Sequence, residues 1–186
     1  MGRSKNRAVF LDRDGVIIKE VNYLRRPEQM RIIPGAAGAI ARLRRAGFKV
    51  VVVSNQSVIA RGHLTRRGLD VIHRLLRREL LRRGARLNAI YYCPHHPRVG
   101  LRVKCGCRKP AIGMLKAAAR RFKLDLKACA MVGDMTVDLR TARNAGCAAI
   151  LVRTGKGGRD GRYKAKPDAV CRNLGAAASW ILRHTA

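Results

Sequence analysis

The sequence has few aromatic residues, few acidic residues and no long apolar run. Phe, Tyr and Trp together make up 4% of its 186 residues, which leaves few rings that could stack on single-stranded nucleic acid. No run of about 18 uncharged apolar residues occurs, so the sequence predicts no membrane-spanning helix. The apolar stretch from Ala8 to Leu11 is too short for a signal peptide, and we therefore expect a cytoplasmic protein.

Basic residues, in contrast, are abundant. The chain contains 41 Lys and Arg against 11 Asp and Glu, which gives a formal net charge of +30 at pH 7. Its hydrophobic content of 47% is nevertheless that of a globular protein and excludes a disordered basic tail. The length is that of one typical domain and no linker divides the chain, so we predict a single domain over residues 1–186.

Short apolar runs alternate with longer helical patterns along almost the whole chain. This alternation is typical of βαβ units and predicts an α/β fold, with a mostly parallel sheet and helices on both faces. The predicted strands span residues 8–11, 48–53, 89–92, 128–132 and 148–152. The predicted helices span residues 34–45, 65–83, 112–121, 137–144 and 173–183.

The second predicted helix is strongly amphipathic. Apolar residues recur along it at steps of three and four, which predicts one buried stripe formed by Leu69, Ile72, Leu76 and Leu80. The opposite face is basic and is expected to be solvated; it carries Arg67, Arg74, Arg78 and Arg82.

Four of the 11 acidic residues come directly after predicted strands. Asp12 and Asp14 follow the first strand, and residues two apart in an extended segment point the same way. Asp134 and Asp138 follow the fourth strand, where they would also suit the first turn of the next helix. Open α/β sheets bind ligands at this edge, and Mg²⁺ prefers carboxylate oxygens. The sequence therefore predicts a Mg²⁺ site in which one carboxylate attacks or binds the metal and another donates a proton.

Two further segments at predicted strand ends suit a phosphate group. Ser54-Asn55-Gln56-Ser57 follows the second strand and offers hydroxyl and amide groups, although such clusters are also common in turns. Arg108 and Lys109 stand just before a predicted helix. A guanidinium, an ammonium and a helix start together predict an anion site.

Three cysteines and two adjacent histidines are concentrated in one 15-residue loop, residues 93–107. In a cytoplasmic protein such thiols are free or metal-bound, and thiolates with imidazole select zinc. Four protein ligands indicate a structural Zn²⁺ site, with His96 as an alternative to His95. The predicted ligands are Cys93, His95, Cys105 and Cys107. The other cysteines lie in or beside apolar runs and are expected to be core residues: Cys129, Cys147 and Cys171.

The glycine-rich segment and three of the histidines indicate no function from the sequence alone. The glycine-rich segment 155–158 lacks the spacing of a phosphate-binding Walker A loop and is predicted to be a surface loop. The sequence identifies no partner for His63, His73 or His184.

Four segments in order, FLDRDGV, SNQS, CRKP and VGDMTVD, resemble the haloacid dehalogenase (HAD) superfamily of phosphotransferases. The added segments CPHHP and CGCRKP are similar to the zinc-bearing branch of that superfamily, which contains heptose-bisphosphate and histidinol phosphatases. The resemblance covers residues 9–155, most of the chain. It implies a Rossmann-like core without a large cap domain and a Mg²⁺-dependent phosphomonoesterase.

The resemblance also implies roles for individual residues. Asp12 would be the nucleophile that forms an aspartyl-phosphate, and Asp14 would protonate the leaving oxygen and then activate water. Asp12, the backbone carbonyl of Asp14 and Asp134 would hold Mg²⁺, and Asp138 would orient Lys109 or the groups around the metal. The phosphoryl group would be bound by Ser54 and Lys109, with Gln56 and Ser57 beside them, and the rest of the substrate by Arg108, Asn55 and Tyr23.

The substrate that the resemblance implies is a small phosphorylated sugar. Separately, we expect the protein to be a monomer. The first expectation is removal of the C7 phosphate of D-glycero-D-manno-heptose 1,7-bisphosphate in nucleotide-heptose biosynthesis, and the alternative is histidinol phosphate. Three positions depart from the pattern of the heptose enzymes: Met135 stands where a basic residue is usual, Ile18 where Asn is usual and Val58 where Gly is usual. These departures concern recognition of the distal phosphate rather than the reaction.

The net charge of +30 suggests a different class of function, the binding of nucleic acid. A nucleic-acid-binding zinc module or a polynucleotide phosphatase would bind phosphate backbones through counterion release, with an affinity that falls steeply with salt. The scarcity of aromatic residues and the spread of arginines over many segments count against this alternative.

Overall fold

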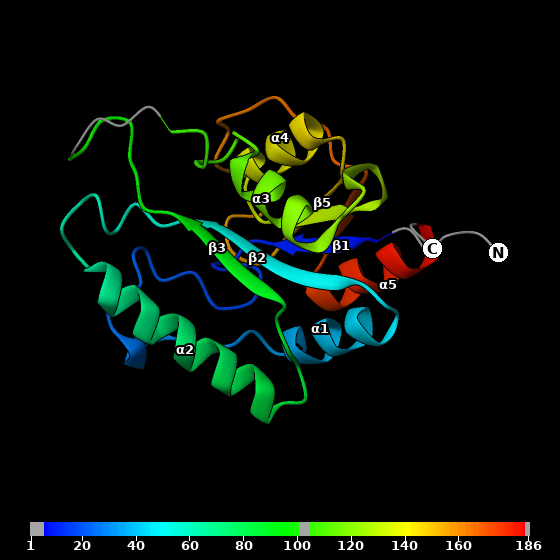
Figure 1. The fold of residues 1–186 in the computed structure, drawn as a ribbon, viewed down its shortest axis with the longest axis horizontal. Helices are drawn as coiled ribbons and strands as arrows, with labels where there is room; N and C mark the ends of the chain where they lie inside the picture. Colours follow the sequence, from blue (N-terminus) through cyan, green and yellow to red (C-terminus); the bar gives the residue numbers. More distant parts are fainter. Residues whose placement is uncertain (1–5, 101–104, 185–186) are drawn as a thin grey trace.

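A six-stranded, all-parallel sheet forms the centre of the computed structural model, which describes residues 6–100 and 105–184 (Figure 1). The strand order is β3-β2-β1-β4-β5-β6, so β1 lies in the middle. Its residue Val9 pairs with Val50 on one side and Ala130 on the other. The strands are β1 (Ala8–Leu11), β2 (Lys49–Asn55), β3 (Ala89–Cys93), β4 (Ala130–Gly133), β5 (Ala148–Val152) and β6 (Ala169–Cys171).

Helices cover both faces of the sheet (Figure 1). On one face, α1 (Ala36–Arg45), α2 (Arg66–Arg82) and α5 (Leu174–His184) share a hydrophobic cluster with alternate residues of β1, β2 and β4. On the other face, α3 (Gly113–Phe122) and α4 (Thr136–Ala145) pack on the remaining strand residues. All four residues of β1 are therefore buried, as expected for the central strand of a parallel sheet.

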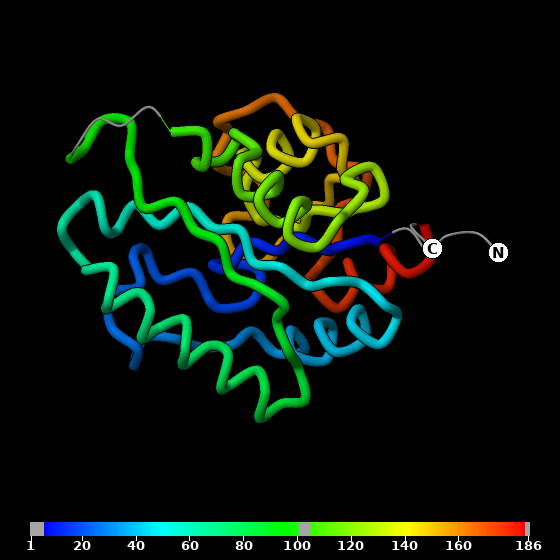
Figure 2. The backbone as a smooth tube through the Cα atoms, in the orientation of Figure 1, coloured from blue at the N-terminus to red at the C-terminus, as the bar shows by residue number. Residues whose placement is uncertain are grey.

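The strand order reverses between β1 and β4, which opens a crevice at the carboxyl ends of these strands. The segments that follow β1, β2 and β3 gather at this edge (Figure 2). Within the described residues, those segments contain no helix longer than the three-residue η1 (Pro27–Gln29) before the next helix of the core begins. No separate cap domain is formed by the part of the chain that the structure describes.

The predicted α/β class, parallel sheet and two-sided helix packing are confirmed, and the bounds of the predicted elements differ from the observed ones by no more than two residues. The strand predicted over 128–132 begins at Ala130, because Asp125 accepts a hydrogen bond from the Lys127 N–H and caps η2 (Leu126–Ala128). Strand β6 was missed because it is short and half exposed, so it has no apolar run. None of the helices formed by residues 6–100 and 105–184 has the length and apolar character of a bilayer span.

The predicted stripe on α2 gives a direct test of the packing. Leu76 is fully buried, whereas Leu81 on the same helix is 56% exposed. Leu76→Ala should lower the free energy of unfolding in urea by about 2–5 kcal/mol, because it removes buried methyl groups and leaves a cavity. The control Leu81→Ala should change it by no more than about 0.5 kcal/mol. Similar losses in both variants would contradict the packing of α2 on the sheet.

Candidate active site

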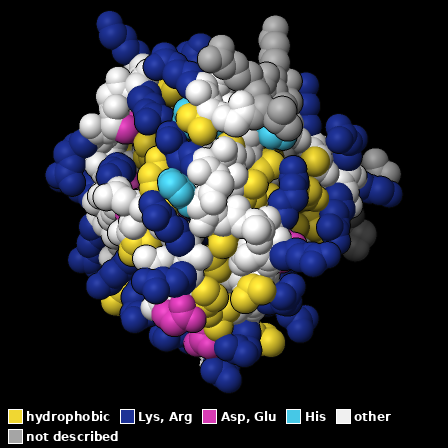
Figure 3. Space-filling view, turned by 90° about the vertical axis from the view of Figure 1, so that its left-hand side faces the viewer, with side chains coloured by type: hydrophobic (Ala, Val, Ile, Leu, Met, Phe, Trp, Pro, Cys, Tyr) yellow, Lys and Arg dark blue, Asp and Glu magenta, His cyan; other side chains and the backbone are white. Residues whose placement is uncertain are grey.

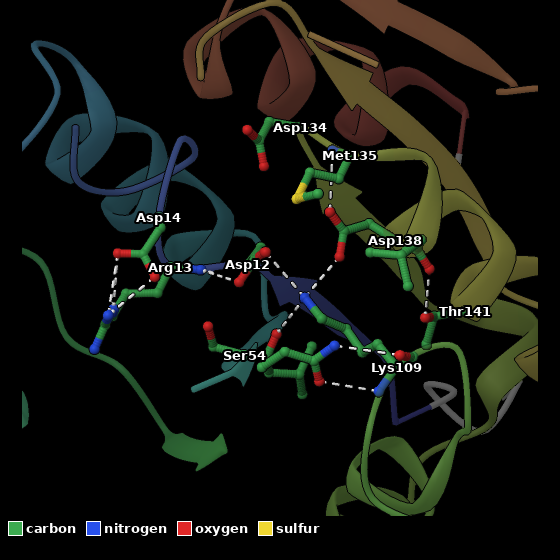
Figure 4. Close-up of polar contacts among 12 residues, drawn as sticks. Asp12, Arg13, Asp14, Ser54, Lys109, Asp134, Met135, Asp138 and Thr141 are labelled. Atoms are coloured by element: carbon green, nitrogen blue, oxygen red, sulfur yellow. Dashed lines mark hydrogen bonds and ion pairs between the residues drawn. The ribbon is translucent and has the colours of Figure 1, made fainter. Parts of the chain in front are cut away.

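A cavity of about 660 Å³ lies at the carboxyl ends of the central strands. Carboxylates that follow β1 and β4 meet the polar residues at the end of β2 and just after it, together with Lys109, which precedes α3 (Figure 4). The parallel topology brings these strand ends to one edge, so residues distant in sequence become neighbours.

Lys109 lies at the centre of a buried ion cluster (Figure 4). Its Nζ is 3.0 Å from Asp12 Oδ2 and 2.6 Å from Asp138 Oδ1, and it donates a third hydrogen bond of 3.0 Å to the carbonyl oxygen of Val53. Burial alone would lower the pKa of Lys109, but the charges of Asp12 and Asp138 raise it above its ordinary value. The ammonium therefore stays protonated and points at Asp12.

Asp138 has two partners that hold it in place. Its Oδ1 accepts from Lys109, and its Oδ2 accepts a 3.1 Å hydrogen bond from the N–H of Met135 at the start of α4. Burial raises the pKa of Asp138 to about 6, against the opposing charge of Lys109. Asp138 thus contacts Lys109 directly, one of the two arrangements that the resemblance left open.

Asp134 is enclosed by a loop that the sequence placed on the surface. The N–H of Lys156 donates a 2.6 Å hydrogen bond to Asp134 Oδ2, and the N–H of Gly158 donates to the Asp134 carbonyl. A Cβ at Gly15 or Gly155, both with positive φ, would overlap the Asp134 carboxylate. Segment 155–158 is a surface loop as expected, with Gly155 and Lys156 exposed, but Lys156 also lines the cavity and its backbone holds Asp134.

Asp14 faces the same cavity but has a different environment from Asp12. Arg13 holds both of its carboxylate oxygens, with Nη2 at 2.9 Å from Oδ2 and 3.1 Å from Oδ1 and Nε at 3.2 Å from Oδ1. Gln56 Nε2 donates a further hydrogen bond of 3.0 Å to Asp14 Oδ2. The two carboxylates thus have separate cationic partners, which is an arrangement suited to separate chemical roles.

The other residues predicted to contact substrate all line the cavity: Tyr23, Ser54, Asn55, Gln56, Ser57, Arg108 and Lys109. Asn55 also bridges to Lys109, since its amide group accepts from the Lys109 N–H at 3.0 Å and donates to the Lys109 carbonyl at 3.2 Å. Ser54 Oγ accepts a 2.9 Å hydrogen bond from Gln56 Nε2. Several of these side chains therefore hold one another as well as facing the cavity.

The four predicted zinc ligands converge beside the cavity. Their donor atoms lie within 4.8 Å of one another, with Cys93 Sγ 3.6 Å from Cys105 Sγ, 3.1 Å from Cys107 Sγ and 3.7 Å from His95 Nδ1. A tetrahedral site with bonds of about 2.3 Å has edges of about 3.8 Å, so this donor set suits a tetrahedral ion. Burial, then hydrogen bonding from Cys107, raises the pKa of the Cys93 thiol, so a cation is needed to hold it as a thiolate.

His96, the alternative to His95, points elsewhere. Its Nε2 lies 3.3 Å from Arg61 Nη2, and its Nδ1 accepts a hydrogen bond from the N–H of Arg98. The structure therefore brings His95, and not His96, to the thiol cluster. Arg108 Nη1 donates a 2.7 Å hydrogen bond to the carbonyl oxygen of His95, which connects this cluster to the cavity.

Cations surround the mouth of the cavity. Figure 3 shows the face at the carboxyl ends of the strands, where Lys and Arg cover much of the surface and few acidic side chains are visible. The lining includes Arg98, Arg108, Lys156 and Arg162, against one acidic residue away from the strand ends, Glu20. The site therefore favours an anionic ligand.

Sequence reasoning missed partners for three residues near or beyond the site. Arg13 and His73 contact each other, Nη1 to Nε2 at 3.3 Å. His63 packs on Tyr23 with ring centroids 5.9 Å apart, and His184 stacks on Trp180. Only the contact of His184 with Trp180 had a signal in the sequence, their spacing of four on one helix.

Two family patterns match the chain. The one described as haloacid dehalogenase-like hydrolase matches residues 9–71, and the one described as HAD-hydrolase-like matches residues 106–177. The first contains Asp12 and Asp14, and the second contains Lys109, Asp134 and Asp138.

Known proteins are similar over nearly the full chain. D-glycero-D-manno-heptose-1,7-bisphosphate 7-phosphatase of Thermosynechococcus vestitus is 45% identical over 96% of this chain and 97% of its own. D-glycero-beta-D-manno-heptose-1,7-bisphosphate 7-phosphatase of Bordetella bronchiseptica is 39% identical over 94% of this chain and 97% of its own. The crystal structure of the B. bronchiseptica enzyme complexed with magnesium and phosphate has a TM-score of 0.84 at 38% identity, and covers 95% of this chain and 98% of that one.

The crowding of carboxylates predicts a pH dependence of stability in Mg²⁺-free buffer. Burial, then repulsion by Asp12, raises the pKa of Asp134 to about 8. Because this pKa lies above the unfolded value of about 4, stability is lost as the pH rises from about 4 through about 8. Asp134→Asn removes the charge but keeps an acceptor for the Lys156 N–H. It should therefore raise the melting temperature at pH 8 by a few degrees, since each kcal/mol of unfolding free energy shifts the melting temperature of a protein of this size by about 2–4 °C.

The gap between Asp134→Asn and wild type should close toward pH 4. Asp168→Asn is the matched control, because hydrogen bonding from Arg143 and Ala149 outweighs burial and lowers the pKa of Asp168. That variant should melt below wild type at pH 8. If Asp134→Asn melted below wild type throughout the pH range, the repulsion at the site would be refuted.

Proposed function

Since the chain belongs to the haloacid dehalogenase-like hydrolase family, we propose that it is a phosphomonoesterase that acts through Asp12. The observation that carries this proposal is the ion cluster at the strand ends, in which Lys109 lies 3.0 Å from Asp12 and 2.6 Å from Asp138. The ammonium can neutralise charge on a phosphoryl group next to Asp12, and phosphoryl transfer depends mainly on such positioning and neutralisation.

The reaction proceeds in two steps on the chain's own side chains. A carboxylate oxygen of Asp12 attacks phosphorus while the ester P–O bond breaks, and Asp14 gives its proton to the leaving oxygen. Asp14 then takes a proton from water, which attacks the aspartyl-phosphate and releases inorganic phosphate and free Asp12. Help from a general acid and base of this kind is typically worth about 10²–10⁴-fold in rate.

The carboxylates fit a divalent cation. Asp12, Asp134 and Asp138 offer oxygens within 4.8 Å of one another, and Lys109 is the one cation that an ion pair joins to them among the described residues. Asp12, Asp134 and the backbone carbonyl of Asp14 would hold Mg²⁺, which supplies charge neutralisation at the phosphoryl oxygens. The thiol cluster would hold a structural Zn²⁺ through Cys93, His95, Cys105 and Cys107.

The proposed substrate is D-glycero-D-manno-heptose 1,7-bisphosphate, with removal of the C7 phosphate, as in the names of the relatives. The cationic mouth supports a second anionic group on the substrate. Arg98, Lys156 and Arg162 line it, although Met135 stands where the heptose enzymes usually carry a basic residue. Histidinol phosphate, the alternative, would bring an ammonium group into this positive field.

A substrate panel with Mg²⁺ tests the proposal. Heptose 1,7-bisphosphate should have the highest kcat/KM, ahead of heptose 7-phosphate and histidinol phosphate. Asp12→Asn should lose at least roughly 10³-fold in kcat on every substrate, because an amide is a poor nucleophile. Preference for histidinol phosphate would favour the alternative substrate, and full activity of Asp12→Asn would refute the mechanism.

Metal analysis tests the thiol cluster independently. Purified protein is expected to contain one zinc per chain, and Cys107→Ser should lose it together with several kcal/mol of stability, since structural zinc can contribute about 10 kcal/mol or more of binding free energy. The control Cys171→Ala, whose thiol lies in β6 outside the cluster, should retain zinc. Equal zinc content in both variants would contradict the proposed ligand set.

A further inference from the structure

Arg13 is a buried cation that joins two residues of the cavity lining, Asp14 and Gln56, to His73 behind them. Its side chain is 1% exposed, although it stands between two carboxylates in the sequence. Its Nη2 and Nε hold the Asp14 carboxylate (Figure 4). Its Nη2 also donates a 2.8 Å hydrogen bond to Gln56 Oε1, and its Nη1 lies 3.3 Å from His73 Nε2. Burial of a guanidinium costs free energy unless its N–H groups have hydrogen-bond acceptors. Each of these contacts therefore helps to set the position of the Arg13 side chain.

His73 supports Arg13 from the far side. It belongs to the buried face of α2 and does not line the cavity. Burial and the charge of Arg13 lower the pKa of His73 to about 3, so its imidazole is neutral. A guanidinium N–H can only donate, which means that His73 Nε2 is the acceptor and the ring proton is on Nδ1. The ring also packs on Tyr92 of β3, with centroids 5.5 Å apart, and this contact limits its rotation.

We propose that Arg13 and His73 are positioning residues for Asp14: Arg13 holds the carboxylate against the cavity wall through two oxygens, and His73 holds Arg13 in that orientation from α2. This inference rests on the proposed role of Asp14 in proton transfer. Gln56 completes the arrangement, because it donates to Asp14 and accepts from Arg13. The Asp14 carboxylate is thus held by residues from three parts of the chain: the segment after β1, the segment after β2 and helix α2.

The geometry explains why such support is needed. A general acid or base works only within hydrogen-bond reach of the proton it transfers, and a small misplacement costs rate. Asp14 is more exposed than Arg13, and all the side-chain hydrogen bonds that it accepts in the described residues come from Arg13 and Gln56. Without His73 the Arg13 Nη1 group would lose its acceptor, and Arg13 would reorient to find another.

The leaving group distinguishes positioning from a general effect on folding. An alkyl phosphate needs a proton on its leaving oxygen, whereas p-nitrophenolate leaves without one. The value of kcat/KM reports formation of the aspartyl-phosphate, the step in which Asp14 acts as the acid. Damage confined to Asp14 should therefore reduce kcat/KM for alkyl phosphates and spare p-nitrophenyl phosphate. Both substrates are assayed on one preparation, so their ratio does not depend on the fraction of folded protein.

His73→Leu is the first variant, because it keeps a similar volume in α2 but removes the acceptor. We expect its kcat/KM on the heptose substrate to fall about 10-fold or more, which is part of the typical contribution of a general acid. Its kcat/KM on p-nitrophenyl phosphate should stay within about twofold of the wild-type value. In His73→Gln the amide oxygen can accept a hydrogen bond from Arg13. Its kcat/KM on the heptose substrate should therefore stay within about threefold of the wild-type value. A selective loss in His73→Gln as large as in His73→Leu would overturn the acceptor role of His73.

Equal losses on both substrates, or no loss on either, would overturn the inference. Arg13→Lys provides the second test should His73→Leu fail to fold, because lysine keeps the positive charge but lacks the planar fork that binds both oxygens of one carboxylate. It should show the same selective loss on the alkyl phosphate, and an unchanged substrate ratio would count against the inference. Failure of the wild-type protein to cleave either substrate would refute the proposed function itself, which separates the two outcomes.

Discussion

The ion cluster of Lys109 with Asp12 and Asp138 is the interaction on which the site depends. It joins the end of β1, the start of α4 and the segment before α3, and the same ammonium bonds the carbonyl of Val53 in β2. Buried ion pairs of this kind are costly to break, because removal of one partner leaves an uncompensated charge. The positions of the surrounding groups are therefore coupled, since Asp12, Asp138 and Lys109 cannot move independently.

Asp12 and Asp14 are close in the sequence, but they have different partners and therefore different environments. Asp12 faces Lys109 and the crowded carboxylates of Asp134 and Asp138, whereas Asp14 faces the buried guanidinium of Arg13. This difference in environment is what allows two chemically identical groups to have the two roles that we propose, attack on phosphorus and proton transfer. Arg13, which lies between them in sequence, is directed away from Asp12 and toward His73 and Gln56.

The cavity is also held in place by three surrounding segments: the thiol cluster, α2 and the loop after β5. The thiol cluster reaches it through the hydrogen bond from Arg108 to the His95 carbonyl, and α2 reaches it through His73. The loop after β5 closes over Asp134 with two backbone N–H groups, and the glycines at positions 15 and 155 leave room for the carboxylate. A rigid surround of this kind keeps the polar groups in place without solvent reorganisation.

The sequence alone determined the fold class, the order of the core strands from β1 to β5 along the chain and which acidic residues reach the carboxyl edge, because hydrophobic periodicity and the placement of Asp after apolar runs are local properties. It also identified the thiol cluster, whose members lie in one loop. Only the tertiary structure decided between His95 and His96, brought Gly155 and Lys156 onto Asp134 and paired Arg13 with His73. These contacts join residues 20 or more positions apart or depend on side-chain direction in a loop, and such relations are set by packing around the sheet, which no local pattern encodes.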